Sequence, residues 1–252
     1  MKYFVSGGKG LILIVFLLIF LSGFLFGNRY GESIPVLNQR LVPIYKVATP
    51  DNKISLTLDG TWGAENTDEL LDIFSEENIK VSFFFAGYWL EKYPHLVEKI
   101  ALAGHDIGNH TYTHPHCNQL SQNELEEELN KTSDFIEDLI GQSPRFFRPP
   151  FGEYNNQVIS TANNQGYQVV QWSIDSHDWQ EPGVDYIVDR VLNNADSGDI
   201  VLMHNNAPHT PEALTELIPA LKERGLKIVP LSKLIYKDDY IIQPHNGLQV
   251  RR

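Results

Sequence analysis

Short apolar runs alternate with amphipathic segments from residue 53 to residue 229, and this alternation constrains the fold more than any other feature. The runs have the length of β-strands, and the segments between them carry apolar residues at helical spacing. Seven runs are read as strands: 54–58, 79–85, 105–108, 145–147, 167–173, 200–203 and 226–229. Strands that alternate with helices pair in parallel. The sequence therefore predicts an α/β domain of about seven parallel strands, forming an incomplete barrel or an open sheet.

Helix start and stop signals support this reading. Ser121 lies three residues before Glu124, and this spacing is typical of a capping box at the start of a helix. Gly141 follows the apolar stripe of the same segment and indicates where the helix ends. Asn66 and Glu69 form a second pattern of the capping-box kind.

The N-terminus predicts a membrane anchor over residues 1–27. Lys2 and Lys9 precede an apolar run over residues 11–27 that only Ser22 interrupts, and 17 residues are at the short end for a bilayer span. No Ala-x-Ala-like cleavage site follows the run. The positive flank places residues 1–9 inside the cell and the rest of the chain outside the cytoplasm. The alternative is a cleaved export signal and a secreted protein.

The rest of the chain divides into three predicted parts. Residues 28–50 hold three prolines and are read as a linker or stalk, residues 51–236 as the globular domain, and residues 237–252 as a mobile tail. A net charge of -12 argues against nucleic acid as a partner. The single cysteine, Cys117, excludes an intramolecular disulfide, which fits a bacterial envelope. The sequence makes no prediction of the oligomeric state.

Polar residues of catalytic type follow the carboxyl ends of the predicted strands. They are Asp59, His110, His114, Arg148, Asp175, Asp178 and His204. In a parallel barrel these strand ends share one face, where the loops after the strands build active sites. Taken alone, each residue is a turn, surface or packing residue at least as often as a functional one. Their joint placement predicts one site.

The residue types predict hydrolysis of an amide or ester. His110 and His114 are four residues apart, and on a helical turn both imidazoles would lie on one face and could hold one metal ion. A bound cation polarises a carbonyl and lowers the pKa of water. A carboxylate can take a proton from that water, and a protonated histidine can donate one to the leaving group. An arginine can orient the carboxylate through a bidentate pair.

Five motifs in this order resemble those of the polysaccharide deacetylases of carbohydrate esterase family 4, which have the NodB-homology fold. The motifs are Thr-Leu-Asp-Gly at 57–60, His-Thr-Tyr-Thr-His at 110–114, Arg-Pro-Pro-Phe-Gly at 148–152, Asp-Ser-His-Asp-Trp at 175–179 and Leu-Met-His at 202–204. The resemblance covers roughly residues 50–236. It implies a distorted (β/α) barrel.

The resemblance also implies a role for each motif residue. Asp59 would be the general base, and Arg148 would hold it. His204 would be the general acid, with Asp178 tuning it. The backbone N–H near Phe151 would help to stabilise the oxyanion.

The metal site departs from the family pattern. The first motif of the family usually has two adjacent Asp residues, and the second is a metal ligand; here Gly60 stands in its place. This resembles the branch that includes spore-associated deacetylases, where the ligand is also absent. Zinc sites normally use three protein ligands, so Asp59 or His116 is a candidate to join His110 and His114. We expect a divalent metal, zinc by preference, bound weakly or absent. A Gly60→Asp substitution is expected to tighten metal binding if the position faces the ion.

Family members remove acetyl groups from N-acetylated sugars, so the resemblance implies an N- or O-acetyl hydrolase acting on peptidoglycan or a chitin-like glycan. Trp62 and Trp179 lie beside motifs and are candidates for contact with sugar rings, whereas Trp172 lies inside a strand-like run and is read as core. Two alternatives are a catalytically degenerate glycan-binding protein, suggested by Gly60, and deacetylation of a small molecule or a polymer outside the wall.

Overall fold

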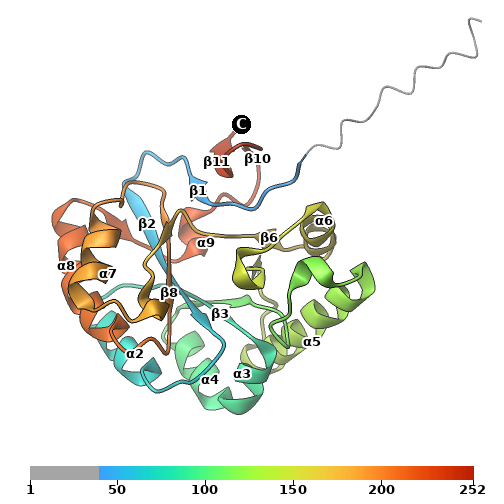
Figure 1. Ribbon diagram of the computed structural model, residues 1–252, viewed down its shortest axis with the longest axis horizontal. Coiled ribbons are helices and arrows are strands. Elements are labelled where there is room, and N and C mark those ends of the chain that lie inside the picture. The colour runs from blue at the N-terminus through green and yellow to red at the C-terminus, as the bar shows by residue number, and fades with distance from the viewer. Residues whose placement is uncertain (1–39) are drawn as a thin grey trace, which may run out of the picture. The chain divides into compact units, whose positions relative to one another are not determined.

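A parallel sheet of eight strands is the framework of the protein in the computed structural model, which describes residues 40–252 (Figure 1). The strands lie in the order β6-β5-β4-β3-β2-β8-β7, and β9 pairs with β2 outside this path. Their bounds are β2 (Lys53–Gly60), β3 (Ser82–Phe85), β4 (Asp106–Asn109), β5 (Phe146–Phe147), β6 (Gln168–Val169), β7 (Ile174–Asp175), β8 (Ile200–His204) and β9 (Lys227–Ile228). The predicted run 167–173 contains β6, and β7 begins just beyond it. The parallel α/β prediction is confirmed, with the strands curved into a half-barrel that stays open between β6 and β7.

Helices cover the outer face of the sheet (Figure 1). They are α2 (Thr67–Glu76), α3 (Gly87–Lys92), α4 (Pro94–Leu102), α5 (Gln122–Ile140), α6 (Asn156–Asn164), α7 (Val184–Leu192) and α8 (Thr210–Glu223). The short helix α9 (Leu231–Leu234) instead packs in a separate buried cluster with Phe84 on the inner side of the sheet. The capping box at Ser121 and Glu124 is formed, and Gly141 closes α5 in the left-handed conformation. The second box is not formed, because the Asn66 side chain makes no cap bond and instead donates to the carbonyl of Ala207.

The two faces of β2 carry different kinds of side chain. Ile54, Leu56 and Leu58 are fully buried against the helices in the main hydrophobic cluster. Thr57 and Asp59 alternate with them and therefore face the interior of the half-barrel, where both contact one arginine. The interior is thus polar at the carboxyl ends of the strands.

The chain before β2 pairs with segments next to β6 and β8, on either side of the sheet's centre. Ile44 pairs with Val170 just after β6, and Lys46 pairs with Asp199 just before β8. Ile44 and Val47 are fully buried. The described residues of the predicted linker, 40–50, therefore belong to the folded domain, and the boundary predicted at residue 51 is wrong. The sequence missed this because the partners of the segment lie more than 100 residues away.

The C-terminal segment is also folded. β10 (Tyr240–Ile242) and β11 (Leu248–Arg251) form an antiparallel pair, and β11 runs parallel to β1 (Lys46–Val47). Gln249 is fully buried and exchanges hydrogen bonds of 2.9 and 3.0 Å with the backbone N–H and carbonyl of Tyr236. The mobile tail predicted for residues 237–252 is therefore wrong.

Residues 40–252 contain no helix that is long and apolar enough to cross a membrane. The anchor predicted for residues 1–27, and residues 28–39 of the predicted linker, lie outside the described residues.

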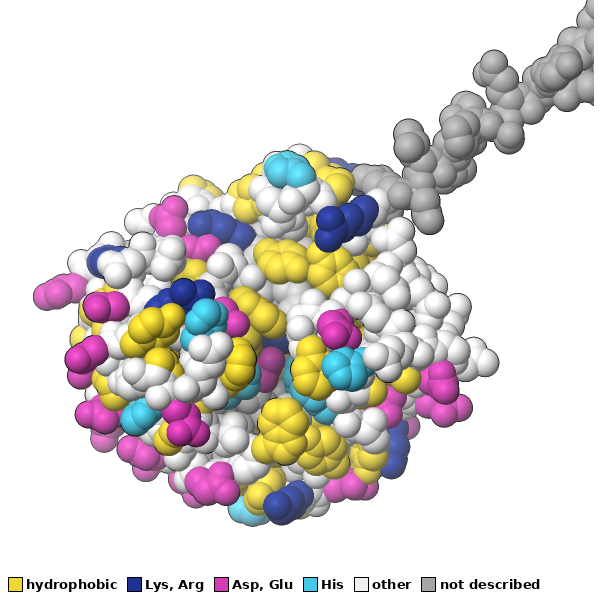
Figure 2. Space-filling model, in the orientation of Figure 1, with side chains coloured by type: hydrophobic (Ala, Val, Ile, Leu, Met, Phe, Trp, Pro, Cys, Tyr) yellow, Lys and Arg dark blue, Asp and Glu magenta, His cyan; other side chains and the backbone are white. Residues whose placement is uncertain are grey.

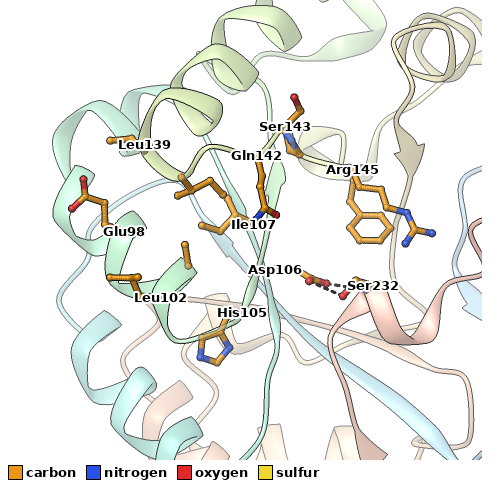
Figure 3. Close-up of a pocket in the computed structure, with 14 residues that line it drawn as sticks. Glu98, Leu102, His105, Asp106, Ile107, Leu139, Gln142, Ser143, Arg145 and Ser232 are labelled. Carbon is orange, nitrogen blue, oxygen red and sulfur yellow. Dashed lines mark hydrogen bonds between the residues drawn. The ribbon is translucent and has the colours of Figure 1, made fainter.

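A cavity of about 680 Å³ lies at the amino ends of β4 and β5 (Figure 3). The Asp106 carboxylate accepts hydrogen bonds there from the Ser82 and Ser232 side chains. Arg145 at its edge donates to Gln168. None of the predicted site residues lines this cavity, since those residues follow the opposite ends of the strands.

Candidate active site

The predicted site residues converge at the carboxyl ends of the strands. Asp59 near the end of β2 is the direct register partner of His204 at the end of β8. The chain leaves β4 at His110 and β5 at Arg148. Asp59, His110, His114 and His204 line one pocket of about 550 Å³. Figure 2 shows hydrophobic, histidine and acidic side chains gathered around a hollow on the face turned to the viewer.

Asp59 and Arg148 form a buried ion pair at the floor of this pocket. Nη1 of Arg148 donates to Oδ1 of Asp59 at 2.6 Å, and Nη2 donates to Oγ1 of Thr57 at 2.9 Å. The carboxylate is therefore held through one oxygen rather than by the predicted bidentate pair, and its Oδ2 lies 3.6 Å from Nε2 of His110. Burial raises the pKa of Asp59, but the charges of Arg148 and His204 lower it further, and the net pKa is lowered. Asp59 is an ionised carboxylate, as a general base must be.

His204 is paired with Asp178. Nδ1 of His204 donates to Oδ1 of Asp178 at 2.8 Å. The other oxygen, Oδ2, accepts from the backbone N–H of His204 at 2.7 Å and from the Thr210 hydroxyl at 2.6 Å. Burial lowers the pKa of His204, but the hydrogen bond and charge of Asp178 outweigh it and the net pKa is raised. The protonated imidazole is favoured, with Nε2 as its remaining donor.

His110 and His114 lie in the loop after β4, not on the helical turn that their spacing suggested. Thr111 and His114 adopt positive φ values of 65° and 57°, and the two imidazole centroids are 4.9 Å apart. Nδ1 of His110 donates to the carbonyl of Arg148 at 2.7 Å, so Nε2 carries the lone pair. Burial lowers the pKa of both rings, that of His114 to about 3. Both are neutral imidazoles, the form that binds metal ions.

The donor chemistry of His110, His114 and Asp59 fits a divalent cation, since two neutral imidazoles and an ionised carboxylate share one pocket. Residues 40–252 contain no group of three His, Cys, Asp or Glu side chains already arranged to hold a metal ion. His116 does not line this pocket, and its Nδ1 lies 3.1 Å from both carboxylate oxygens of Glu153. Its role as a third ligand stays a prediction.

Position 60 does not face the other donors. Gly60 is the last residue of β2, and neighbouring residues of a strand point to opposite faces. A Cβ on Gly60 would lie 2.3 Å from Cδ1 of Phe85, on the side turned away from Asp59. The Phe85 ring is itself stacked on Trp89 at 4.1 Å. The conditional expectation that an Asp at position 60 would supply the missing ligand is not met by this geometry.

Three exposed aromatic side chains surround the pocket. Trp62, Phe151 and Trp179 are 60%, 53% and 55% exposed, and all three line it. Trp172 is half-buried and lines the pocket too, so its reading as a core residue is wrong. Asp175 lies at the pocket edge, where its Oδ1 accepts from the backbone N–H of His177 at 2.9 Å, as a turn former does.

Two functional contacts were missed in the sequence. Thr57 precedes Asp59 by two residues and so shares its strand face, which was a usable signal. Thr210 supports Asp178 from the start of α8, 32 residues further along the chain. No local pattern predicts that contact.

The parallel half-barrel, with a paired acid and a paired base at the carboxyl ends of its strands, is typical of a hydrolase. The sequence model of the family described as Polysaccharide deacetylase matches residues 46–170. A peptidoglycan-N-acetylglucosamine deacetylase of Bacillus cereus is 36% identical over 196 residues, covering 75% of this chain and 71% of that protein. A chitooligosaccharide deacetylase of Rhizobium leguminosarum bv. trifolii is 34% identical over 201 residues, covering 74% and 94%.

Solved structures agree with this. The crystal structure of a CE4 family pseudoenzyme from Bacillus anthracis superposes with a TM-score of 0.75 at 31% identity, covering 84% of this chain and 73% of that one. The chain belongs to the polysaccharide deacetylase family.

Proposed function

We propose that the protein hydrolyses acetyl groups on a cell-wall-type polysaccharide. N-acetyl groups are the first choice of substrate and O-acetyl groups the second. One observation carries this proposal: an ionised Asp59 held by Arg148 and a proton-bearing His204 held by Asp178 are register partners on adjacent strands and line the same pocket. A base and an acid fixed on either side of one space are the parts that amide hydrolysis needs.

The geometry supports the following division of labour. Oδ2 of Asp59, the oxygen not held by Arg148, takes a proton from the attacking water. The backbone N–H of Phe151 helps to stabilise the negative charge that develops on the acetyl oxygen. Nε2 of His204 gives its proton to the departing amine. A divalent metal held by His110 and His114 would polarise the acetyl carbonyl and acidify the water.

The pocket rim supports a glycan substrate. Trp62, Phe151 and Trp179 present exposed aromatic faces, on which the apolar faces of sugar rings stack. Relatives named as peptidoglycan and chitooligosaccharide deacetylases make N-acetylglucosamine units the first substrates to test.

Acetate release tests the proposal. The wild type is assayed on N-acetylglucosamine oligomers, peptidoglycan, an O-acetylated glycan and free N-acetylglucosamine, beside Asp59→Asn, His204→Ala and the exposed control His95→Ala. We expect losses of about 10²-fold or more for the first two variants and none for His95→Ala. Equal release by all four proteins would refute the assigned roles. Release from the free sugar alone would favour a small-molecule substrate.

A second candidate is a glycan-binding protein without catalysis. Gly60 in place of a ligand and the similarity to a CE4 family pseudoenzyme favour it. Binding of the oligomers by the wild type without any acetate release would support this reading over the enzyme. The intact acid and base pairs favour the enzyme, because a binder needs neither.

We also infer that residues 1–27 anchor the protein in the cell membrane, with the domain outside the cytoplasm. Lys2, Lys9 and the apolar run over residues 11–27 support this. Cell fractionation with protease treatment of intact spheroplasts tests it, and we expect a membrane-bound chain whose domain is digested. A mature protein in the medium that lacks residues 1–27 would establish the secreted alternative.

A further inference from the structure

The ring of Phe151 contacts two imidazoles of the loop after β4. His116 stacks on it with centroids 4.4 Å apart and planes at 18°, and His114 meets it edge to face at 4.6 Å. The loop after β4 therefore contacts the loop after β5 through this ring. Phe151 is also the residue whose backbone N–H is assigned to the oxyanion.

A carboxylate fastens the stacked imidazole to the same loop. Nδ1 of His116 lies 3.1 Å from both oxygens of Glu153, two residues after Phe151. His116 is thus held both by the ring of Phe151 and by the side chain of Glu153. Neither His116 nor Glu153 lines the pocket, so neither is placed to touch a substrate there.

The backbone of Phe151 needs such support. Its φ of 58° and ψ of 9° lie in the left-handed region, which a bulky side chain rarely adopts unless its surroundings hold it there. The direction of its N–H depends on that conformation. With its ring 53% exposed, Phe151 has little packing on its solvent side, so the stacked imidazole is a main part of what holds it.

We propose that His116 and Glu153 are a positioning pair that holds Phe151 in the left-handed conformation and so aims its backbone N–H into the pocket. The proposal rests on the proposed hydrolysis for its effect on rate. The structural effect on Phe151 stands independently of any activity.

Three variants separate the two contacts of His116. His116→Ala removes both, His116→Phe keeps a stacked ring without the bond to Glu153, and Glu153→Ala removes the bond alone. His95→Ala on α4 is the matched histidine control.

We expect His116→Ala to lower kcat for acetate release by roughly ten- to a hundredfold with KM within about twofold, because a misaimed donor acts on the transition state. His116→Phe should keep kcat within about threefold of wild type, because ring stacking is retained. Unchanged kcat in His116→Ala, or an equal loss in His116→Phe and His116→Ala, would overturn the proposal.

Hydrogen exchange of the backbone amides of residues 151–153 supplies a readout without activity. We expect exchange there to be at least about tenfold faster in His116→Ala, intermediate in Glu153→Ala and unchanged in His95→Ala, with the strand amides of β2 as the folding control. Unchanged exchange in His116→Ala would overturn the proposal. Faster exchange together with a wild type that releases no acetate would uphold the pair and refute the proposed function instead.

Discussion

Asp59 and His204 face each other across β2 and β8, and their surroundings move their pKa values in opposite directions. Arg148 keeps the first ionised, and Asp178 keeps the second protonated. Two titratable groups whose pKa values are shifted in opposite directions can act as base and acid at the same pH. The division of roles thus follows from each residue's partner.

The alkaline limb of the activity profile tests the Asp178 contact. His204 must be protonated to act, and its pKa is raised, so activity should persist above the ordinary imidazole pKa and fall as pH rises through the raised value. In Asp178→Asn the lowering effect of burial dominates. We expect the limb of kcat/KM to move to lower pH by about one unit or more. Asp175→Asn, which removes a more weakly acting charge, should move it less, and equal shifts would contradict this account.

Gly60 makes a second residue-scale prediction. Because a Cβ there would meet the Phe85 ring, Gly60→Asp should lower the free energy of unfolding by at least about 1–3 kcal/mol from crowding alone. Zinc affinity, measured by titration calorimetry, should not rise above that of the wild type. A clear gain in affinity would show that the position faces the ion after all.

A double-mutant cycle isolates the steric cause. Gly60→Ala carries no charge and should also destabilise, whereas its cost should be smaller when Phe85→Val is present. Phe83→Val on the same strand is the matched control. If the destabilisations caused by Gly60→Ala and Phe85→Val simply add in the double mutant, the Phe85 ring is not the group that an added Cβ meets.

At the scale of elements, the parts that could be predicted were those with a local signal. The strand runs, the cap at Ser121 and the strand-end position of Asp59 all follow from spacing within a few residues. The helical turn for His110 and His114 failed because spacing alone cannot exclude a loop with residues at positive φ. The Thr210 contact and the β1–β11 pairing could not be found, since each joins distant parts of the chain.

The C-terminal pair of strands should contribute measurably to stability. The buried side-chain amide of Gln249 accepts a hydrogen bond from the backbone N–H of Tyr236 and donates one to the carbonyl of Tyr236. Gln249→Ala leaves the backbone N–H of Tyr236 unpaired, whereas the carbonyl still accepts from Gln168, so we expect a loss of about 1–3 kcal/mol in the free energy of unfolding. Denaturant unfolding measures it, with the half-buried Gln243→Ala as a control of the same residue type. Equal stability of Gln249→Ala and wild type would mean that this segment behaves as the tail first predicted.

For the molecule as a whole, the domain boundary decides which fragment folds. Chains that begin at residue 40 keep Ile44 and Val47, whereas chains that begin at residue 51 lose both, together with the pairings next to β6 and β8. At about 1.5–3 kcal/mol for each buried side chain, we expect the shorter fragment to melt well below the longer one. Thermal unfolding followed by circular dichroism compares the two fragments. Equal melting temperatures would mean that residues 40–50 behave as the linker first predicted.

The enclosed pair of Asp59 and Arg148 also sets a limit on acid tolerance. Arg148 is fully buried, and its counter-charge is the carboxylate of Asp59, the proposed base. Because the folded pKa of Asp59 lies below its unfolded value, the pair stabilises the fold fully above about pH 4 and less as pH falls through the folded value. Removing the carboxylate by mutation strands the same buried cation, at a cost of about 3–5 kcal/mol. Protonation of Asp59 therefore removes both the ion pair that stabilises the fold and the proposed base. An inactive Asp59 variant must first be shown to be folded.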